Sequence, residues 1–236
     1  MTGARGQLPF EFAHQPDFRE EAFIVAACNR AARAWIERWP DWPPGPGLAV
    51  HGPAGSGKTH LGAIWQIRSE AVAIDPAALE PARVPDLLGD ARAAVIDWPD
   101  EPSLAPAGEQ ALLHLHNLLA EQGGHLLLLA RTPPARWPIR LADLRSRLAA
   151  LPAIRIDAPD DELLEAVLTK LLADRQLEAT PDAIAYLLAR MERSFDAARS
   201  LVAELDRRAL AGGRRITVSL VRETLADWDE KAPDRP

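Results

Sequence analysis

The feature that most constrains this chain is the segment at residues 52–59, which reads G-P-A-G-S-G-K-T. It matches the P-loop pattern G-x-x-x-x-G-K-[S/T], which requires a strand before it and a helix after it. Residues 48–51 are a short apolar run, typical of a buried strand, and Leu61, Ile64 and Trp65 then recur at helical spacing. Strand, glycine loop and helix in this order predict an α/β domain.

The residue types of this loop suit a phosphate group. Glycine lets the backbone curl so that successive N–H groups face an anion, and the following helix adds the positive end of its dipole. We expect Lys58 to reach the β- and γ-phosphates of a nucleotide and the Thr59 hydroxyl to bind Mg²⁺. A chance glycine turn is the alternative, and both flanks count against it. The expected nucleotide-binding residues of the loop are Gly52, Gly55, Ser56, Gly57, Lys58 and Thr59.

A second apolar run ends in an acid. Residues 93–97 read A-A-V-I-D, and in P-loop enzymes an aspartate at this point holds Mg²⁺ through water. Thr59 and Asp97 are therefore the expected metal ligands. Many such enzymes carry a further acid beside the first to orient the attacking water, but here Trp98 follows. The sequence thus favours nucleotide binding over hydrolysis.

Composition narrows the class of protein. The chain has 236 residues, of which 47% are hydrophobic, and a formal net charge of −7, which argues against a broad phosphate-seeking surface. Its single cysteine, Cys28, excludes a disulfide within the chain and fits a reducing compartment. No apolar run reaches membrane length, and the first residues lack the layout of a signal peptide. We expect a soluble cytoplasmic protein without a membrane partner.

The first residues hold a short apolar peptide. In Q-L-P-F-E-F, residues 7–12, an extended backbone places Leu8, Phe10 and Phe12 on one side. An edge strand folded onto the body is an equally good interpretation of the pattern. Pro9 disfavours a paired strand, however, and an extended apolar peptide on a tether is able to enter a groove of another protein.

The rest of the chain divides into a mixed part and a helical part. We expect strands at residues 48–51, 71–75, 93–97, 125–130 and 153–156, and helices that include residues 110–122 and 141–151, with Asn29 as the N-cap of an earlier helix. From Pro159 onward the pattern is all-helical. The predicted organisation is an N-terminal arm (1–18), a nucleotide-binding α/β domain (19–157), a helical domain (158–228) and a tail (229–236).

This layout resembles the AAA+ ATPases, and several segments resemble the bacterial initiator DnaA. Residues 23–31 look like the segment beside the adenine in DnaA, and residues 57–61 are similar to its P-loop. Residues 131–134 stand where DnaA relatives carry Asp-Arg followed by proline. Residues 144–148, L-R-S-R-L, look like their arginine-finger segment, with Arg147 in the finger position.

The resemblance covers about residues 19–228 and implies a fold: an α/β AAA+ P-loop NTPase domain with a parallel sheet, followed by a small all-helical lid domain. It implies ATP or ADP with Mg²⁺ as cofactors, and adds Asn29 and His60 to the expected nucleotide-binding residues. The helix-turn-helix domain of DnaA is not found after the lid, so we expect no direct sequence-specific DNA binding.

The N-terminal peptide narrows the resemblance to the Hda family, the DnaA-related regulatory inactivators. The peptide is similar to the Q-L-x-L-x-[L/F] motif that docks in the bacterial sliding clamp, the β subunit of DNA polymerase III; the expected partner-binding residues are Gln7, Leu8, Phe10 and Phe12. By this likeness the protein would sit on the DNA-loaded clamp and present Arg147 to ATP held by DnaA, which would then be hydrolysed. This would be negative regulation of replication initiation.

Three positions depart from the family pattern. Trp98 replaces a polar residue, so intrinsic ATPase activity is expected to be weak or absent, and the main role would be activation of a partner's hydrolysis. Arg131 stands where an aspartate is usual, and Asp196 stands where a sensor arginine is expected. Arg193 and Arg199 lie about one turn from Asp196 and are candidates to replace it.

Two other functions fit the same residues. One is a free-standing AAA+ ATPase, such as a helicase-loader-like remodeller, and Trp98 counts against it. The other is a nucleotide-gated adaptor without a role in hydrolysis, and Arg147 together with the N-terminal peptide counts against that. The resting nucleotide and the oligomeric state, including a homo-oligomer, stay open.

Overall fold

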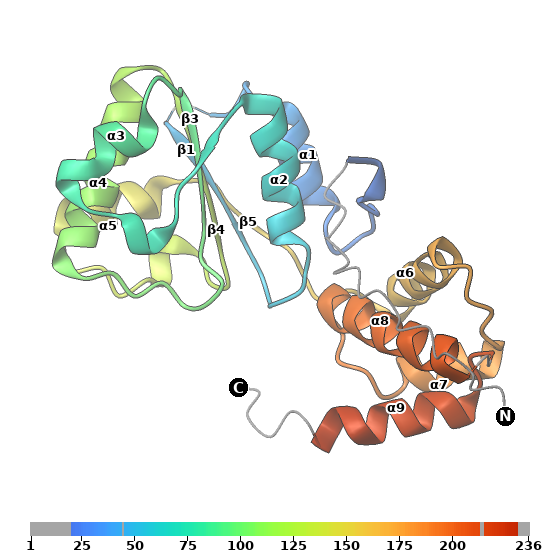
Figure 1. Ribbon diagram of the computed structural model, residues 1–236. Coiled ribbons are helices and arrows are strands. Elements are labelled where there is room, and N and C mark those ends of the chain that lie inside the picture. The colour runs from blue at the N-terminus through green and yellow to red at the C-terminus, as the bar shows by residue number, and fades with distance from the viewer. Residues whose placement is uncertain (1–19, 44, 213–214, 231–236) are drawn as a thin grey trace, which may run out of the picture.

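The computed structural model describes residues 20–43, 45–212 and 215–230. The predicted clamp-binding peptide, with Gln7, Leu8, Phe10 and Phe12, lies outside these residues. The described chain forms an α/β part and, next to it, a smaller helical part (Figure 1). Among these residues, no helix combines the length and apolar character needed to cross a bilayer.

A parallel sheet organises the α/β part. In the described residues it has five strands in the order β2-β3-β4-β1-β5. The strands are β1 (Gly47–His51), β2 (Val72–Ala73), β3 (Ala93–Asp97), β4 (His125–Ala130) and β5 (Ala153–Arg155). The apolar runs predicted β1, β3, β4 and β5 to within a residue. The second strand is shorter than predicted, since only two residues of the 71–75 run pair with β3.

Helices cover both faces of this sheet. They are α1 (Arg30–Arg38), α2 (Lys58–Ser69), α3 (Val84–Leu88), α4 (Pro106–Glu121) and α5 (Ala142–Ala150), with short 3₁₀ segments η1 (Glu20–Ala22), η2 (Pro76–Ala78), η3 (Pro81–Arg83) and η4 (Pro134–Arg136). Helix α4 begins earlier than the predicted residue 110, because Pro106 fits the first turn, where no backbone N–H is needed.

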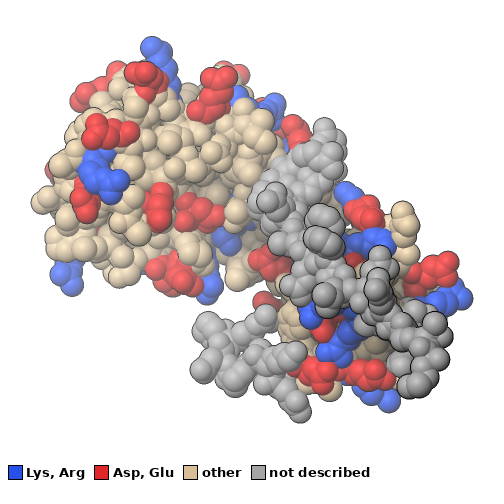
Figure 2. Space-filling model, viewed as in Figure 1, with Lys and Arg blue, Asp and Glu red and all other residues tan. Residues whose placement is uncertain are grey.

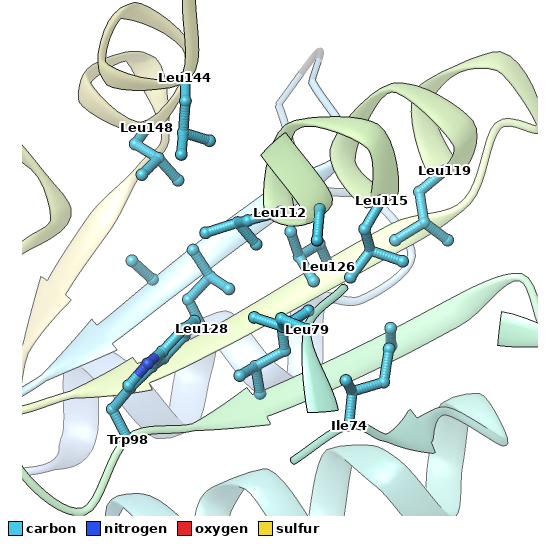
Figure 3. Packing of buried hydrophobic residues seen from close by; sticks show 14 of the residues in the cluster. Ile74, Leu79, Trp98, Leu112, Leu115, Leu119, Leu126, Leu128, Leu144 and Leu148 are labelled. Atoms are coloured by element: carbon cyan, nitrogen blue, oxygen red, sulfur yellow. The ribbon is translucent and has the colours of Figure 1, made fainter. Parts of the chain in front are cut away.

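Alternation along β4 sorts its side chains between two cores. Leu126 and Leu128 pack in the core under α3, α4 and α5 (Figure 3). Leu127 and Leu129 pack on the opposite face, in the core under α1 and α2. A strand buried on both faces reads as a continuous apolar run, which is why β4 was easy to find in the sequence.

The helical part has a core of its own. It comprises α6 (Asp161–Asp174), α7 (Pro181–Leu188), α8 (Phe195–Gly212) and α9 (Val218–Glu230). The first three of these helices begin with a side-chain cap: Asp160, Thr180 and Ser194 each accept a hydrogen bond from the backbone N–H three residues later. A parallel bridge between Ala179 and Ile216 is the departure from the all-helical pattern among the described residues.

Charged side chains of both signs are interspersed on the visible face of the described residues (Figure 2). On that face neither Lys and Arg nor Asp and Glu form a broad single-sign surface. This agrees with the sequence argument against a broad phosphate-seeking surface.

Candidate functional site

The loop between β1 and α2 has the backbone geometry of an anion cradle. Gly57, just before α2, has φ +96°, in the left-handed region that favours glycine. At Gly52 a Cβ would lie 2.2 Å from the Ile156 carbonyl oxygen, so a side chain does not fit there. The glycines at these two positions therefore let the loop curl tightly at the carboxyl end of the sheet, where α2 begins.

Lys58 is held inside this loop. Its Nζ donates hydrogen bonds to the carbonyl oxygens of Gly52 (2.9 Å) and Pro53 (2.7 Å), and the residue is buried. Burial lowers the pKa of Lys58; the charge of Arg131 lowers it further, while those of Asp97 and Asp196 raise it. The ammonium group is thus fixed in position by the loop it belongs to.

Thr59 and Asp97 meet as the sequence predicted. The Thr59 hydroxyl donates a 2.6 Å hydrogen bond to Oδ2 of Asp97, at the end of β3. Burial raises the pKa of Asp97, and the hydrogen bond from Thr59 and the charge of Lys58 oppose that rise. Among the described residues no group of three or more His, Cys, Asp or Glu is arranged to hold a metal. A divalent cation here would therefore rely on one carboxylate, one hydroxyl and oxygens from outside the protein.

Ser56 supplies an independent test of whether the cradle fits an anion. In the described part of the chain its hydroxyl is buried without a hydrogen-bond partner. A buried polar group usually has a partner, and the first N–H groups of α2 also lack intrahelical acceptors. An anion bound between them would satisfy both.

His60 contacts Phe23, and Asn29 bonds the segment that follows Phe23. The Phe23 ring packs edge-on against His60, with centroids 5.2 Å apart, and a Cβ on Gly57 would lie 3.5 Å from that ring. Asn29 is fully buried: its Oδ1 accepts from the Ala26 N–H and its Nδ2 donates to the Ile24 carbonyl, each at 2.9 Å. Asn29 stands at the N-cap position of α1 as predicted, but its side chain does not bond the helix, because its amide bonds the preceding segment.

The Trp98 side chain is buried in a hydrophobic core, so it does not occupy the position from which a catalytic acid would orient a water molecule. It is 5% exposed, and its ring packs against Trp137 with centroids 4.9 Å apart, in the core under α4 and α5 (Figure 3). Its backbone N–H donates to the Leu129 carbonyl (2.8 Å). The side chain after Asp97 thus points into a hydrophobic core.

The next two acids are held by residues after β4. Arg131 donates to the Pro99 carbonyl (2.8 Å) and pairs with Asp100 (3.2 Å). Thr132 donates to Glu101 (2.7 Å). Both acids therefore turn toward the end of β4.

The first turn of α8 contacts the P-loop, which the sequence did not predict. The Phe195 N–H donates to the Gly55 carbonyl at 2.9 Å. Asp196 pairs with Arg199, and Arg193 pairs with Asp161 at 3.0 Å. The two arginines considered as sensor replacements are therefore both engaged by carboxylates, and Asp196 itself lies beside the loop. No local pattern could reveal this contact, since it joins segments far apart in the chain.

Arg147 does not join this cluster. It is exposed on α5, while Leu144 and Leu148 of the same helix are buried, as the helical spacing predicted. Within the described residues no hydrogen bond or ion pair engages its guanidinium, whereas Arg145 donates to the Ile139 carbonyl at 3.4 Å. Burial lowers the pKa of His116 on α4, and the nearby charge of Arg147 lowers it further.

The chain is similar to bacterial replication proteins in sequence and in fold. A family model described as "Hda, lid domain" matches residues 160–225. The chromosomal replication initiator protein DnaA of Sphingopyxis alaskensis is 28% identical over 251 residues, covering 93% of this chain and 53% of the relative. The chain thus spans about half the length of this curated relative.

Two solved structures share the fold. Domain III of the Thermotoga maritima initiator DnaA matches with a TM-score of 0.78 and 18% identity, over 90% of this chain and 97% of that one. AMPPCP-bound DnaA from Aquifex aeolicus matches with a TM-score of 0.71 and 16% identity, over 92% and 71%. Together with the lid match they confirm the predicted α/β P-loop domain followed by a helical lid.

Proposed function

We propose that this AAA+ protein, a relative of DnaA with an Hda-type lid, regulates the initiation of chromosomal replication from the DNA-loaded sliding clamp. In this proposal it works in the cytoplasm, binds ATP or ADP, and promotes hydrolysis of the ATP held by DnaA. Its domains are the arm at residues 1–18, the nucleotide-binding domain at 19–157, the lid at 158–228 and a tail. The separate hydrophobic cores of the α/β and helical parts support the division near residue 157.

The loop residues are proposed to hold the nucleotide. Lys58, fixed against the Gly52 and Pro53 carbonyls, would contact the phosphates, and Ser56 with the first N–H groups of α2 would complete the cradle. The bound nucleotide would supply oxygens that complete a Mg²⁺ site with Thr59 and Asp97. Gly55, Gly57, His60 and Asn29 would shape the loop and its edge. The AMPPCP in the related DnaA structure supports this assignment.

Weak intrinsic hydrolysis follows from the residue after Asp97. Trp98 is buried against Trp137, and the nearby acids Asp100 and Glu101 are engaged by Arg131 and Thr132. Trp98 cannot orient an attacking water, and these contacts draw the two acids toward the end of β4. This favours a nucleotide-binding regulator over a free-standing ATPase or remodeller.

The exposed guanidinium of Arg147 is the observation that carries the proposed mechanism. A planar guanidinium that no internal partner engages is suited to another protein's phosphate oxygens, where it stabilises charge that develops during phosphoryl transfer. Arg145 is two residues away and bonds its own chain, so it serves as a control on the same helix.

Clamp docking rests on the sequence alone. Gln7, Leu8, Phe10 and Phe12 would enter the clamp groove as an extended peptide, and the described structure begins after them. The role of the arm is therefore to raise the local concentration of the regulator at DNA-loaded clamps.

A reconstituted assay tests the proposed function. Hydrolysis of DnaA-bound ATP is measured with DNA-loaded clamp, with free clamp and with no clamp, each with and without this protein. We expect acceleration only when this protein and DNA-loaded clamp are present together. Equal hydrolysis in all conditions would reject the regulator and leave the nucleotide-gated adaptor as the remaining candidate.

A further inference from the structure

Three charged side chains from different elements act on Lys58. Asp97 lies at the end of β3, Arg131 follows β4, and Asp196 lies in the first turn of α8. All three have partners: Asp97 bonds Thr59, Arg131 bonds the Pro99 carbonyl and Asp100, and Asp196 pairs with Arg199. Asp196 brings negative charge from the lid to a loop that is suited to anions, and the function proposed above does not use it.

The lid holds Asp196 against the loop. The Phe195 N–H donates to the Gly55 carbonyl at 2.9 Å. A Cβ on Gly55 would lie 2.6 Å from the Ser194 Cβ and 3.3 Å from Oδ2 of Asp196. Ser194 is itself buried and caps α8. The backbone at Asp196 is therefore held beside the loop, and its exposed carboxylate pairs with Arg199.

We propose that Asp196 is an internal anion that opposes the phosphate groups of the nucleotide and thereby sets both nucleotide affinity and the discrimination between diphosphate and triphosphate. The inference rests on the proposed nucleotide binding at the P-loop. Like charges close to one site repel, and a triphosphate carries more negative charge than a diphosphate, so the penalty grows with the phosphate chain.

Arg199 limits the size of this effect. It pairs with Asp196 one turn along α8, so the pair is close to neutral overall, with the carboxylate on the side of the loop. The Asp196 side chain is also 65% exposed, and solvent screens a charge at such a position. We therefore expect removal of the Asp196 charge to change affinity by about two- to fivefold.

Asp161 provides a matched control. It lies in the first turn of lid helix α6, its side chain is 60% exposed, and it pairs with Arg193, much as Asp196 pairs with Arg199 in the first turn of α8. The charge of Asp161 is not among the groups that act on Lys58. Asp161→Asn therefore removes an equivalent lid charge without the proposed contact.

The experiment measures dissociation constants for ADP and for AMPPCP, both with Mg²⁺, in the wild-type protein, Asp196→Asn and Asp161→Asn. We expect Asp196→Asn to bind both nucleotides more tightly, with the larger gain for AMPPCP, and Asp161→Asn to match the wild type. The gain should shrink between about 50 mM and about 500 mM salt, because salt screens exposed charges. Melting temperatures check folding, and Asp196→Ser, which also removes the charge, is the second variant.

The outcomes separate this inference from the proposed function. If the wild type binds nucleotide and Lys58→Ala weakens it, but neither Asp196 variant binds more tightly, this inference is wrong and nucleotide binding stands. If the Asp196 variants gain equal affinity for ADP and AMPPCP, the proposed discrimination between diphosphate and triphosphate is wrong. If neither the wild type nor any variant binds nucleotide, both fail.

Discussion

Replacing Trp98 tests whether the position after Asp97 belongs to the hydrophobic core or to the nucleotide site. The residue is 5% exposed, and its ring lies 4.9 Å from that of Trp137, at an interplanar angle of 59°. Truncation of a buried tryptophan to alanine costs about 3–5 kcal/mol, and an aromatic pair of this kind contributes about 0.5–1.5 kcal/mol within that loss. We expect Trp98→Ala to lower the free energy of unfolding by about 3–5 kcal/mol.

The informative variant is Trp98→Glu, which places an acid where many P-loop enzymes have one. Its carboxylate would point into the core that contains Leu128 and Trp137, where an unpaired charge is strongly disfavoured. We expect a loss of stability at least as large as for Trp98→Ala and no gain in ATP hydrolysis. Trp98→Gln, which is close in shape but cannot ionise, is the matched control.

Urea unfolding of the four proteins at pH 7 and pH 5 is the measurement. Burial raises the pKa of a glutamate, so the folded state of Trp98→Glu is most favoured below the ordinary pKa and loses stability as pH rises through the raised value. The difference between the Glu and Gln variants should therefore be larger at pH 7 than at pH 5. A Trp98→Glu protein with wild-type stability, or with new ATPase activity, would refute the placement of this side chain.

Three further predictions follow from single contacts. Lys58→Ala should weaken ADP binding by about 2 kcal/mol or more, because it removes the cation that is fixed in the loop. Calorimetry measures this, and an unchanged affinity would exclude the P-loop as the nucleotide-binding site. Asp97→Asn should reduce ADP binding with Mg²⁺ more than ADP binding without metal, and equal losses in both conditions would leave Asp97 a structural role only. The same variant should raise the stability of the nucleotide-free protein at pH 7, because the environment of Asp97 disfavours its charged form. Changing Gln7 and Leu8 to alanine should abolish clamp binding without altering melting temperature, and a large drop in stability would instead place the arm in the fold.

The sequence predicted the elements whose signal is local. The continuous apolar runs of β3 and β4 were found because both faces of each strand are buried. The P-loop was found because its glycines, Lys58 and Thr59 are close together in the chain. Thr59 and Asp97 were expected to serve one metal because both stand at ligand positions of the P-loop pattern, and their side chains are hydrogen-bonded to each other.

Contacts between distant segments could not be predicted in this way. The sequence marked Trp98 as unusual but did not predict its packing against Trp137, which directly follows η4. Asp196 was noted as a departure, but its place beside Gly55 follows from docking of the whole lid. Asn29 occupies an N-cap position and yet bonds Ile24 and Ala26, because the segment before α1 is folded against the domain.

Arg147 gives the most direct test of the central claim. DnaA–ATP hydrolysis is measured on DNA-loaded clamp with the wild-type protein, Arg147→Ala, Arg147→Lys and Arg145→Ala, after each variant is shown to bind ADP and clamp normally. We predict that Arg147→Ala loses the stimulation of DnaA–ATP hydrolysis, whereas Arg145→Ala stimulates it like the wild type. Arg147→Lys should restore little of the stimulation, because a point charge cannot reproduce the contact of a planar guanidinium with phosphate oxygens. Full stimulation by Arg147→Ala would contradict the account.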